Sequence, residues 1–203
     1  MNVLKGLLVF LLMASFYAAL AVAENASVVG DDKNPRIAFG AADLREVIRT
    51  CGVADVRIFV GAGGGQATQP AMIEADVWLP DKPESFVIAP SGKDIGILGS
   101  DDVGAMYGCL ELAERLRLDG AKALDLDPEK PIVQSPFLDF RAVNPFLTLP
   151  YGPETLETWW FLQEDFWRGY LDMLARARIN WLDLHGMYGI KKTDFPSIYP
   201  YFV

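Results

Sequence analysis

The order of predicted elements in residues 138–184 constrains the fold of this chain more than any other feature. Residues 138–143 predict a strand, residues 163–178 a helix that buries one apolar face, and residues 180–184 a second strand. Two strands joined through a helix run parallel, because the crossover returns the chain to the same end of the sheet. Parallel strands belong to doubly wound sheets or barrels in which helices cover the sheet.

The first half of the chain predicts a separate α/β unit. Strands are expected at 36–39, 56–60, 85–89 and 94–98, and helices at 41–51 and 101–116. Gly104 and Gly108 lie four residues apart on the second helix, which carries too many charges to span a membrane. We therefore expect this helix to approach the sheet closely at its glycines. Both helices are available to cover one face of the sheet, as in an α+β-like domain.

Prolines 128, 131 and 136 predict a linker over 125–136, between a domain at 24–124 and a second part at 137–203. A complete (β/α)₈ barrel needs roughly 250 residues. Residues 137–203 are far fewer, so we expect an incomplete TIM-barrel start, truncated before most of its strands. The fold class predicted for the whole chain is α/β.

Residues 1–23 predict a signal peptide. Lys5 supplies a positive end, residues 6–19 are apolar, and Ala21-Val22-Ala23 fits a small-x-small cleavage site. The alternative is an uncleaved membrane anchor, since the apolar run is near the lower limit for crossing a bilayer. A cleaved signal peptide would direct export of the mature chain to the periplasm or outside the cell.

The net charge of −9 argues against nucleic acid and anionic membranes as partners, because both bind clustered Lys and Arg. The chain has two cysteines, Cys51 and Cys109, both on predicted helices. Export would permit a disulfide between them. Our default expectation, however, is two separate buried thiols.

Few side chains in the sequence indicate a metal, cofactor or substrate-binding site. His185 is the one histidine of the sequence, no cysteine pair has zinc-ligand spacing, and no cofactor motif is present, so we expect neither metal nor cofactor. His185 ends a predicted parallel strand, where barrel enzymes place functional groups, but a structural histidine fits as well. Arg141, within an apolar strand, either pairs with Asp139 or faces a polar pocket that holds sugar hydroxyls.

Several segments resemble secreted glycoside hydrolases. Residues 85–88, 95–99, 104–108 and 110–114 are similar to the N-terminal α/β domain of bacterial β-N-acetylhexosaminidases, and a similar domain precedes the barrel of α-glucuronidases. The phrase Pro136-x-x-x-x-Arg141 resembles the first barrel strand of hexosaminidases. Residues 167–185 resemble the first barrel helix and second strand.

The resemblance implies that Arg141 and His185 contact a glycan substrate. Asn180 and His185 keep the hexosaminidase spacing, but Asp183 replaces the family's first histidine, so an α-glucuronidase-like enzyme fits equally. In such enzymes the two catalytic acids come from later barrel strands, and we identify no catalytic residue here. We expect the front end of an exported enzyme that hydrolyses O-glycosyl bonds when completed. The alternatives are a non-catalytic carbohydrate-binding or adaptor module and an inactive gene remnant.

Overall fold

The computed structural model describes residues 26–63, 79–147, 160 and 163–186. The chain divides into two compact units, Met1–Phe137 and Leu138–Val203. We call them unit 1 and unit 2. The predicted signal peptide at 1–23 lies outside the described residues.

Unit 1 contains a five-stranded mixed sheet in the order β1-β2-β4-β3-β5. Its strands are β1 (Ser27–Val29), β2 (Arg57–Ala62), β3 (Phe86–Ser91), β4 (Asp94–Gly99) and β5 (Ile132–Gln134). The first three in spatial order are parallel, whereas β3 runs antiparallel to β4 and β5. The predicted strands at 56–60, 85–89 and 94–98 are confirmed as β2, β3 and β4.

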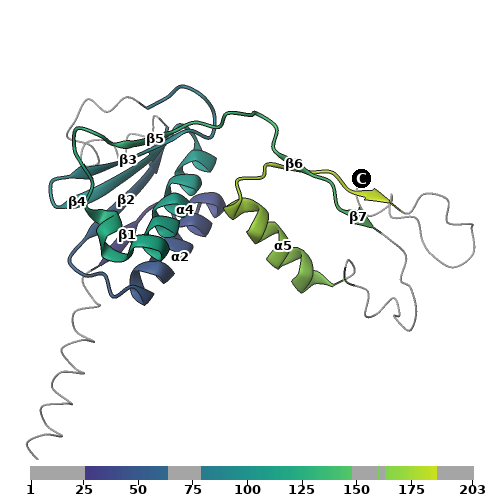
Figure 1. Ribbon diagram of the computed structural model, residues 1–203, viewed down its shortest axis with the longest axis horizontal. Helices are drawn as coiled ribbons and strands as arrows, with labels where there is room; N and C mark the ends of the chain where they lie inside the picture. The colour runs from purple at the N-terminus through teal and green to yellow at the C-terminus, as the bar shows by residue number, and fades with distance from the viewer. Residues whose placement is uncertain (1–25, 64–78, 148–159, 161–162, 187–203) are drawn as a thin grey trace, which may run out of the picture. The chain divides into compact units, whose positions relative to one another are not determined.

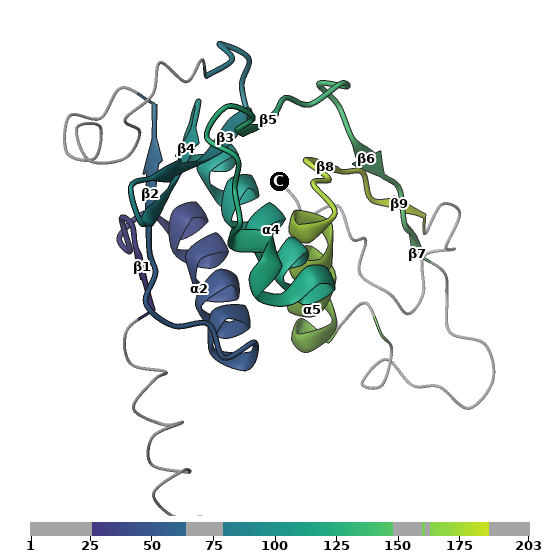
Figure 2. The ribbon, with the colours of Figure 1, turned by 60° about the vertical axis from the view of Figure 1, so that its left-hand side comes forward.

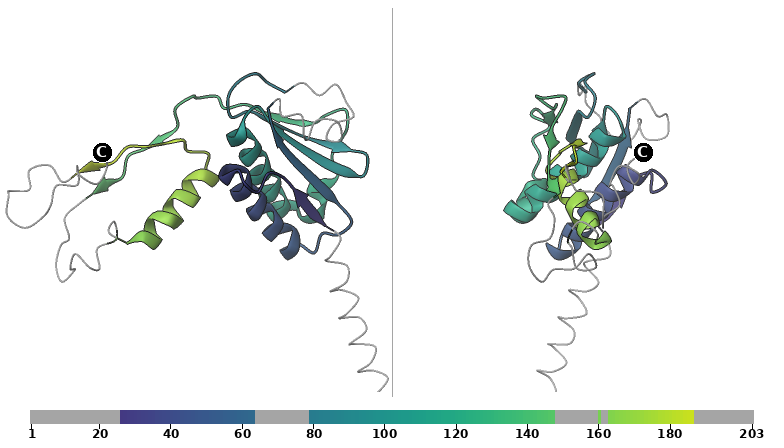
Figure 3. Two further views of the ribbon diagram at one scale, coloured as in Figure 1. Left: turned by 180° about the vertical axis from the view of Figure 1, so that it is seen from behind. Right: turned by 90° about the vertical axis from the view of Figure 1, so that its right-hand side faces the viewer.

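Both long helices of unit 1 cover the same face of this sheet (Figures 1 and 3). They are α2 (Pro35–Thr50) and α4 (Asp102–Asp119), and a 3₁₀ segment, η1 (Gly120–Leu124), follows α4. Their apolar faces are buried on the sheet, with Leu44, Leu112 and Leu116 fully enclosed. The predicted α/β class, with two helices on one face, is confirmed for unit 1.

The strand predicted at 36–39 is wrong, because these residues form the first turn of α2. Asn34 is the N-cap, and its side-chain oxygen accepts hydrogen bonds from the backbone N–H groups of Arg36 and Ile37. Pro35 then occupies the first helical position, where its missing N–H costs nothing. These two residues start the helix six positions earlier than its apolar spacing suggested.

The predicted linker also differs from the structure. Residues 132–134 form β5, which pairs with β3 and completes the sheet at its edge. The Ser85 hydroxyl donates to the Ser135 hydroxyl oxygen at 2.9 Å, next to the end of this pairing. Prolines at 131 and 136 bracket the short strand, and a strand at a sheet edge tolerates flanking proline. Unit 1 therefore extends to Phe137.

The two glycines of α4 lie against the sheet, as predicted. A Cβ at Gly104 would overlap the Ser85 carbonyl oxygen, and one at Gly108 would overlap the Ile97 side chain. A third glycine, Gly40 of α2, faces α4, where a Cβ would lie 2.8 Å from the Met106 carbonyl oxygen. Glycines thus set the distance between α4 and the sheet and the distance between α2 and α4.

The described part of unit 2 contains two short parallel strand pairs, and a helix separates the two strands of each pair in sequence. β6 (Ala142–Val143) pairs with β8 (Trp181–Leu182), and β7 (Phe146–Leu147) pairs with β9 (His185–Gly186), each in parallel. The helix is α5 (Glu164–Arg176). Figure 2 shows the two pairs following one another along the same direction. The parallel crossover predicted from the sequence is confirmed, although its first strand begins at Ala142 instead of Leu138.

The cysteines form no bridge. Cys109 is fully buried in α4, and burial raises the pKa of its thiol to about 12. Cys51 is exposed at the end of α2. Both thiols are free, so the disulfide alternative is not realised, and one of the two thiols is not buried.

Substituting the glycines of α4 tests the close approach. We expect Gly104→Ala and Gly108→Ala each to lower the free energy of unfolding by about 1–3 kcal/mol or more, because the added methyl has no space. Chemical denaturation followed by circular dichroism measures the change. Leu118→Ala, at an exposed position of the same helix, is the control and should change stability by about 0.5 kcal/mol or less. Equal effects at all three positions would contradict the packing.

We expect the two cysteines to differ in reactivity. Iodoacetamide should alkylate Cys51 in the native protein and leave Cys109 unmodified, because the attacking species is the thiolate. Mass spectrometry of tryptic peptides should find one label under native conditions and two in denaturant. Native labelling of Cys109 at a rate close to that of Cys51 would be inconsistent with its burial.

Candidate functional site

The sequence predicts functional side chains at the carboxyl ends of the parallel strands of unit 2. The strand pairing is held by backbone hydrogen bonds that continue beyond β6 and β8. The N–H groups of Asn180 and Trp181 both donate to the Arg141 carbonyl oxygen, at 3.0 and 3.2 Å. Further along, the Asp183 N–H donates to the Val143 carbonyl oxygen at 2.9 Å. This ladder fixes which side chains lie at which end.

Arg141 lies at the amino end of the pairing, immediately before β6. Its Nε donates to the Arg178 carbonyl oxygen at 2.5 Å, and its Nη1 donates to the Leu138 carbonyl oxygen at 2.7 Å. Both acceptors precede the paired strands in sequence. The guanidinium therefore ties together the two segments that lead into β6 and β8. Neither of these two hydrogen bonds involves the Asp139 carboxylate, and the pairing of Arg141 with Asp139 stays a prediction.

Asn180 reinforces the same end. Its side-chain oxygen accepts from the Arg141 N–H at 2.9 Å, and its Nδ2 donates to the Asp139 carbonyl oxygen at 2.8 Å. One side-chain amide thus pairs with the neighbouring backbone as another strand residue would. The sequence drew attention to Asn180 only by resemblance, and its role in fixing register was missed. An asparagine at the start of a predicted strand is a weak signal for such a role.

His185 is the first residue of β9, opposite Phe146 of β7. Its side chain lies outside what the structure describes. Arg141 comes five residues before Phe146, so at about 3.3 Å per residue the two predicted site residues are separated by about 16 Å along the strands. The structure does not bring Arg141 and His185 together, and their roles as substrate contacts stay predictions.

A polar pair lies between these two positions. The Asn144 side-chain N–H donates to the Asp183 Oδ2 at 2.7 Å, and both residues are exposed. Asn144 directly follows β6 and Asp183 directly follows β8. The sequence placed Asp183 on a strand but gave no partner for it, and it missed Asn144. Asn144 follows the predicted strand at 138–143 directly, and that position could have identified it.

In unit 1, a carboxyl group with a shifted pKa, that of Asp94, lies at the amino end of a strand. Asp94 begins β4 beside Arg57, which begins β2, and Arg57 Nη2 donates to Asp94 Oδ2 at 2.6 Å. This hydrogen bond lowers the pKa of Asp94 below its ordinary value. Asp94 is buried, and its Oδ1 has no partner in the described part of the chain. A carboxyl held ionised at the amino end of parallel strands is a structural ion pair and not a general acid.

A shallow hollow of about 450 Å³ lies in unit 1 at the carboxyl ends of β2 and β4, with Arg36 on one side. Asp101, the N-cap of α4, lines it and uses both carboxylate oxygens on backbone N–H groups, those of Gly104 at 2.7 Å and Glu84 at 3.0 Å. The start of α4 is therefore already neutralised by the chain's own carboxylate. Arg36, Ser100 and Asp102 also line the hollow in the described part of the chain.

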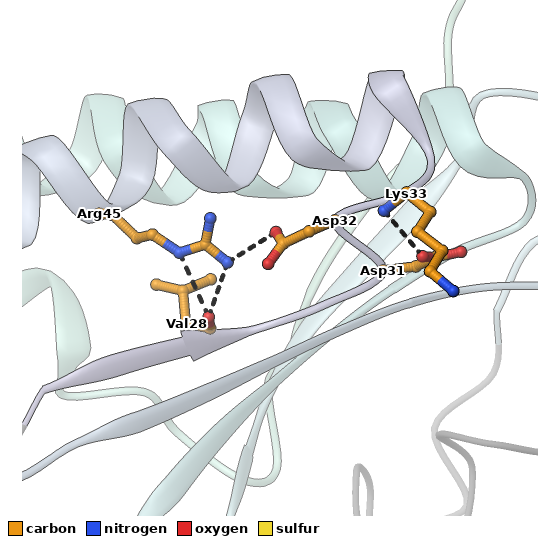
Figure 4. Close-up of polar contacts among 5 residues, drawn as sticks. All are labelled: Val28, Asp31, Asp32, Lys33 and Arg45. Atoms are coloured by element: carbon orange, nitrogen blue, oxygen red, sulfur yellow. Dashed lines mark hydrogen bonds and ion pairs between the residues drawn. The ribbon is translucent and has the colours of Figure 1, made fainter.

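The charged side chains at the end of β1 are also structural. Arg45 of α2 donates from Nε and Nη2 to the Val28 carbonyl oxygen, at 3.3 and 3.0 Å, and from Nη2 to Asp32 at 2.9 Å (Figure 4). The Lys33 N–H donates to Asp31 Oδ1 at 3.0 Å in the same loop. Arg45 thus fastens α2 to an edge strand of three residues.

Within the described ranges, no three His, Cys, Asp or Glu side chains are grouped as metal ligands would be. Over the same ranges, no helix has the length and apolar character needed to cross a bilayer. The expectations of no metal and no cofactor stay predictions.

Comparison with known proteins relates the fold to two carbohydrate-active enzymes. An enzyme of glycoside hydrolase family 138 that targets pectin rhamnogalacturonan II matches 79% of this chain at 24% identity and a TM-score of 0.58. A family 115 4-O-methyl-α-glucuronidase with specificity for decorated arabinogalactans matches 80% at 19% identity and a TM-score of 0.60. No protein-family model and no curated protein matches the chain.

The chain spans about a quarter of the length of each of these two enzymes. At this identity the likeness establishes the fold alone. This chain therefore shares an α/β fold with glycoside hydrolases over most of its length.

Acid should weaken the Arg57–Asp94 pair. Because the pKa of Asp94 is lowered in the folded protein, its contribution to stability is present above the unfolded pKa, near 3.9, and is lost as the pH falls through the lower folded value. Urea denaturation between pH 7 and pH 2.5 should show wild type converging on Asp94→Asn below about pH 4. The exposed Asp119→Asn variant is the control. A difference from Asp94→Asn that is independent of pH would contradict the ionised pair.

Proposed function

We propose that these 203 residues form the front part of an exported glycan-degrading hydrolase, in which unit 1 precedes a (β/α)₈ barrel that unit 2 begins. The observation that carries this proposal is the parallel β6–α5–β8 crossover directly after an α/β domain. Its support from known proteins is the shared fold with two glycoside hydrolases. Signal-directed export and release of the mature chain are part of the same proposal.

Exposed apolar side chains of unit 2 support a larger barrel. Phe140 and Trp181 are 72% and 55% exposed and contact each other edge to face, with ring centroids 5.8 Å apart. In α5, Leu174 is buried while Leu171 and Met173 are about half exposed. Parallel strands are stable when helices and neighbouring strands cover them. Further βα units of a longer protein would provide this cover.

The reaction in this proposal is hydrolysis of an O-glycosyl bond. It requires one carboxylic acid that protonates the leaving oxygen and a second carboxylate, or a substrate acetamido group, that assists on the other side of the sugar. The acid pair would come from strands beyond Leu182. His185, the first residue of β9, is retained as a proposed substrate contact. Arg141 is assigned a positioning role, because two of its donors hold backbone carbonyl oxygens.

The finer enzyme type is also a proposal. Hexosaminidase-like and α-glucuronidase-like enzymes both place a similar α/β domain before the barrel. The two differ in the sugar removed, which is a neutral N-acetylhexosamine in one and a uronic acid in the other. A panel of chromogenic glycosides that contains both types therefore distinguishes them.

The test compares two proteins: the 203-residue chain and the product of the longest genomic reading frame that contains it. With nitrophenyl glycosides, we expect no turnover by the 203-residue chain and turnover of at least one glycoside by a longer product. Turnover by the 203 residues alone would show that the acid pair lies within them. A longer product that neither binds nor hydrolyses any glycan would contradict the proposed function.

A further inference from the structure

We propose that the outer edge of β1 is a strand-pairing surface for the β1 edge of a second copy of this chain, and that Arg45 blocks this pairing in the native protein. The inference goes beyond the proposed function and does not depend on it, because every residue that carries it lies in unit 1. An open strand edge presents backbone N–H and C=O groups, and such a row of groups binds another extended strand.

The first step in the argument is the position of β1 in the sheet. The spatial order β1-β2-β4-β3-β5 places β1 at one edge, where β2 is its one strand partner among the described residues. The strand at the opposite edge, β5, lies between prolines 131 and 136, and proline discourages the addition of a further strand. No proline lies within or next to β1, so its edge needs another form of protection.

The second step is which backbone groups of β1 face outward. The Ser27 N–H donates to the Val56 carbonyl oxygen at 3.0 Å, so Ser27 directs its backbone groups to β2. Because backbone groups alternate between the two edges of a strand, those of Val29 also face β2, and those of Val28 face the outer edge. Val29 is 48% exposed beside them, and a further strand would cover part of this apolar surface.

The third step is the group that occupies this edge. Arg45 of α2 donates from Nε and Nη2 to the Val28 carbonyl oxygen, at 3.3 and 3.0 Å, as Figure 4 shows. A carbonyl oxygen has two lone pairs, so these two donors leave no place for the N–H of another strand. Asp32 accepts from Nη2 at 2.9 Å and holds the guanidinium there. An incoming strand would also have to desolvate this ion pair, whose side chains are 39% and 65% exposed.

The fourth step is the partner. Without the guanidinium, Val28 presents one outward donor and one outward acceptor. Two such residues related by a two-fold axis form a reciprocal pair of N–H to C=O hydrogen bonds, which is the unit of an antiparallel ladder. The same pairing places each Val29 opposite a Ser27 of the other copy and covers part of its exposed surface. A second copy of β1 therefore satisfies the whole edge that Arg45 now blocks.

Sedimentation velocity over a concentration series tests the inference on the full 203-residue chain. Arg45→Met removes the guanidinium and keeps an apolar stem. We expect this variant to self-associate at concentrations about tenfold or more below those that wild type needs. Arg49→Met is the matched control, because it lies on the same helix, loses the same charge and breaks the exposed ion pair with Glu46. It should associate as wild type does.

Two further readouts identify the edge. Val28→Pro, added to Arg45→Met, removes the outward N–H and no hydrogen bond to β2, so it should return association to the wild-type level. In Arg45→Met itself, hydrogen exchange at the Val28 amide should slow as the protein concentration rises. The inference is overturned if Arg45→Met associates no more strongly than wild type or Arg49→Met, if Val28→Pro in folded protein leaves its association unchanged, or if the Val28 amide stays unprotected while the variant associates.

Discussion

The parallel pairing of β6 with β8 is the constraint on which the rest of unit 2 depends. In a parallel pair both strands begin at the same end and finish at the other end, so the two ends carry different residues and can have different roles. At the amino end of the strands, the side chains of Arg141 and Asn180 form hydrogen bonds with backbone atoms. At the carboxyl end, Asn144 and Asp183 bond to each other and stay exposed. One end therefore holds the register, and the other end presents exposed polar side chains.

Unit 1 depends on a different constraint, the space between its helices and its sheet. Gly104 and Gly108 allow α4 to lie directly on β3 and β4, and Gly40 allows α2 to lie against α4. The resulting core excludes water so completely that Cys109 is fully buried. The charged groups at its edges, Arg57 with Asp94 and Arg45 with Asp32, hold strand ends in place.

The elements with strong periodicity could be predicted from the sequence, and those set by single residues could not. The β-branched strands β2 to β4 and the parallel crossover follow from local pattern. The start of α2 was not predicted, because Asn34 and Pro35 begin the helix through capping and a favoured first position, which the spacing of apolar residues does not show. The strand β5 was not predicted, because three residues between prolines form a strand only when they can pair with the open edge of a sheet. At the site, Asp183 was placed on a strand, but Asn144 is 39 residues away and becomes its partner only through the fold.

Cross-strand nuclear Overhauser effects in isotope-labelled protein test the central claim most directly, because they report the register without reference to activity. The account predicts cross-peaks between the backbone protons of Ala142 and Val143 and those of Trp181 and Leu182, in the pattern of a parallel pair. An antiparallel pattern, or the absence of any contact between these two segments in folded protein, would contradict the account.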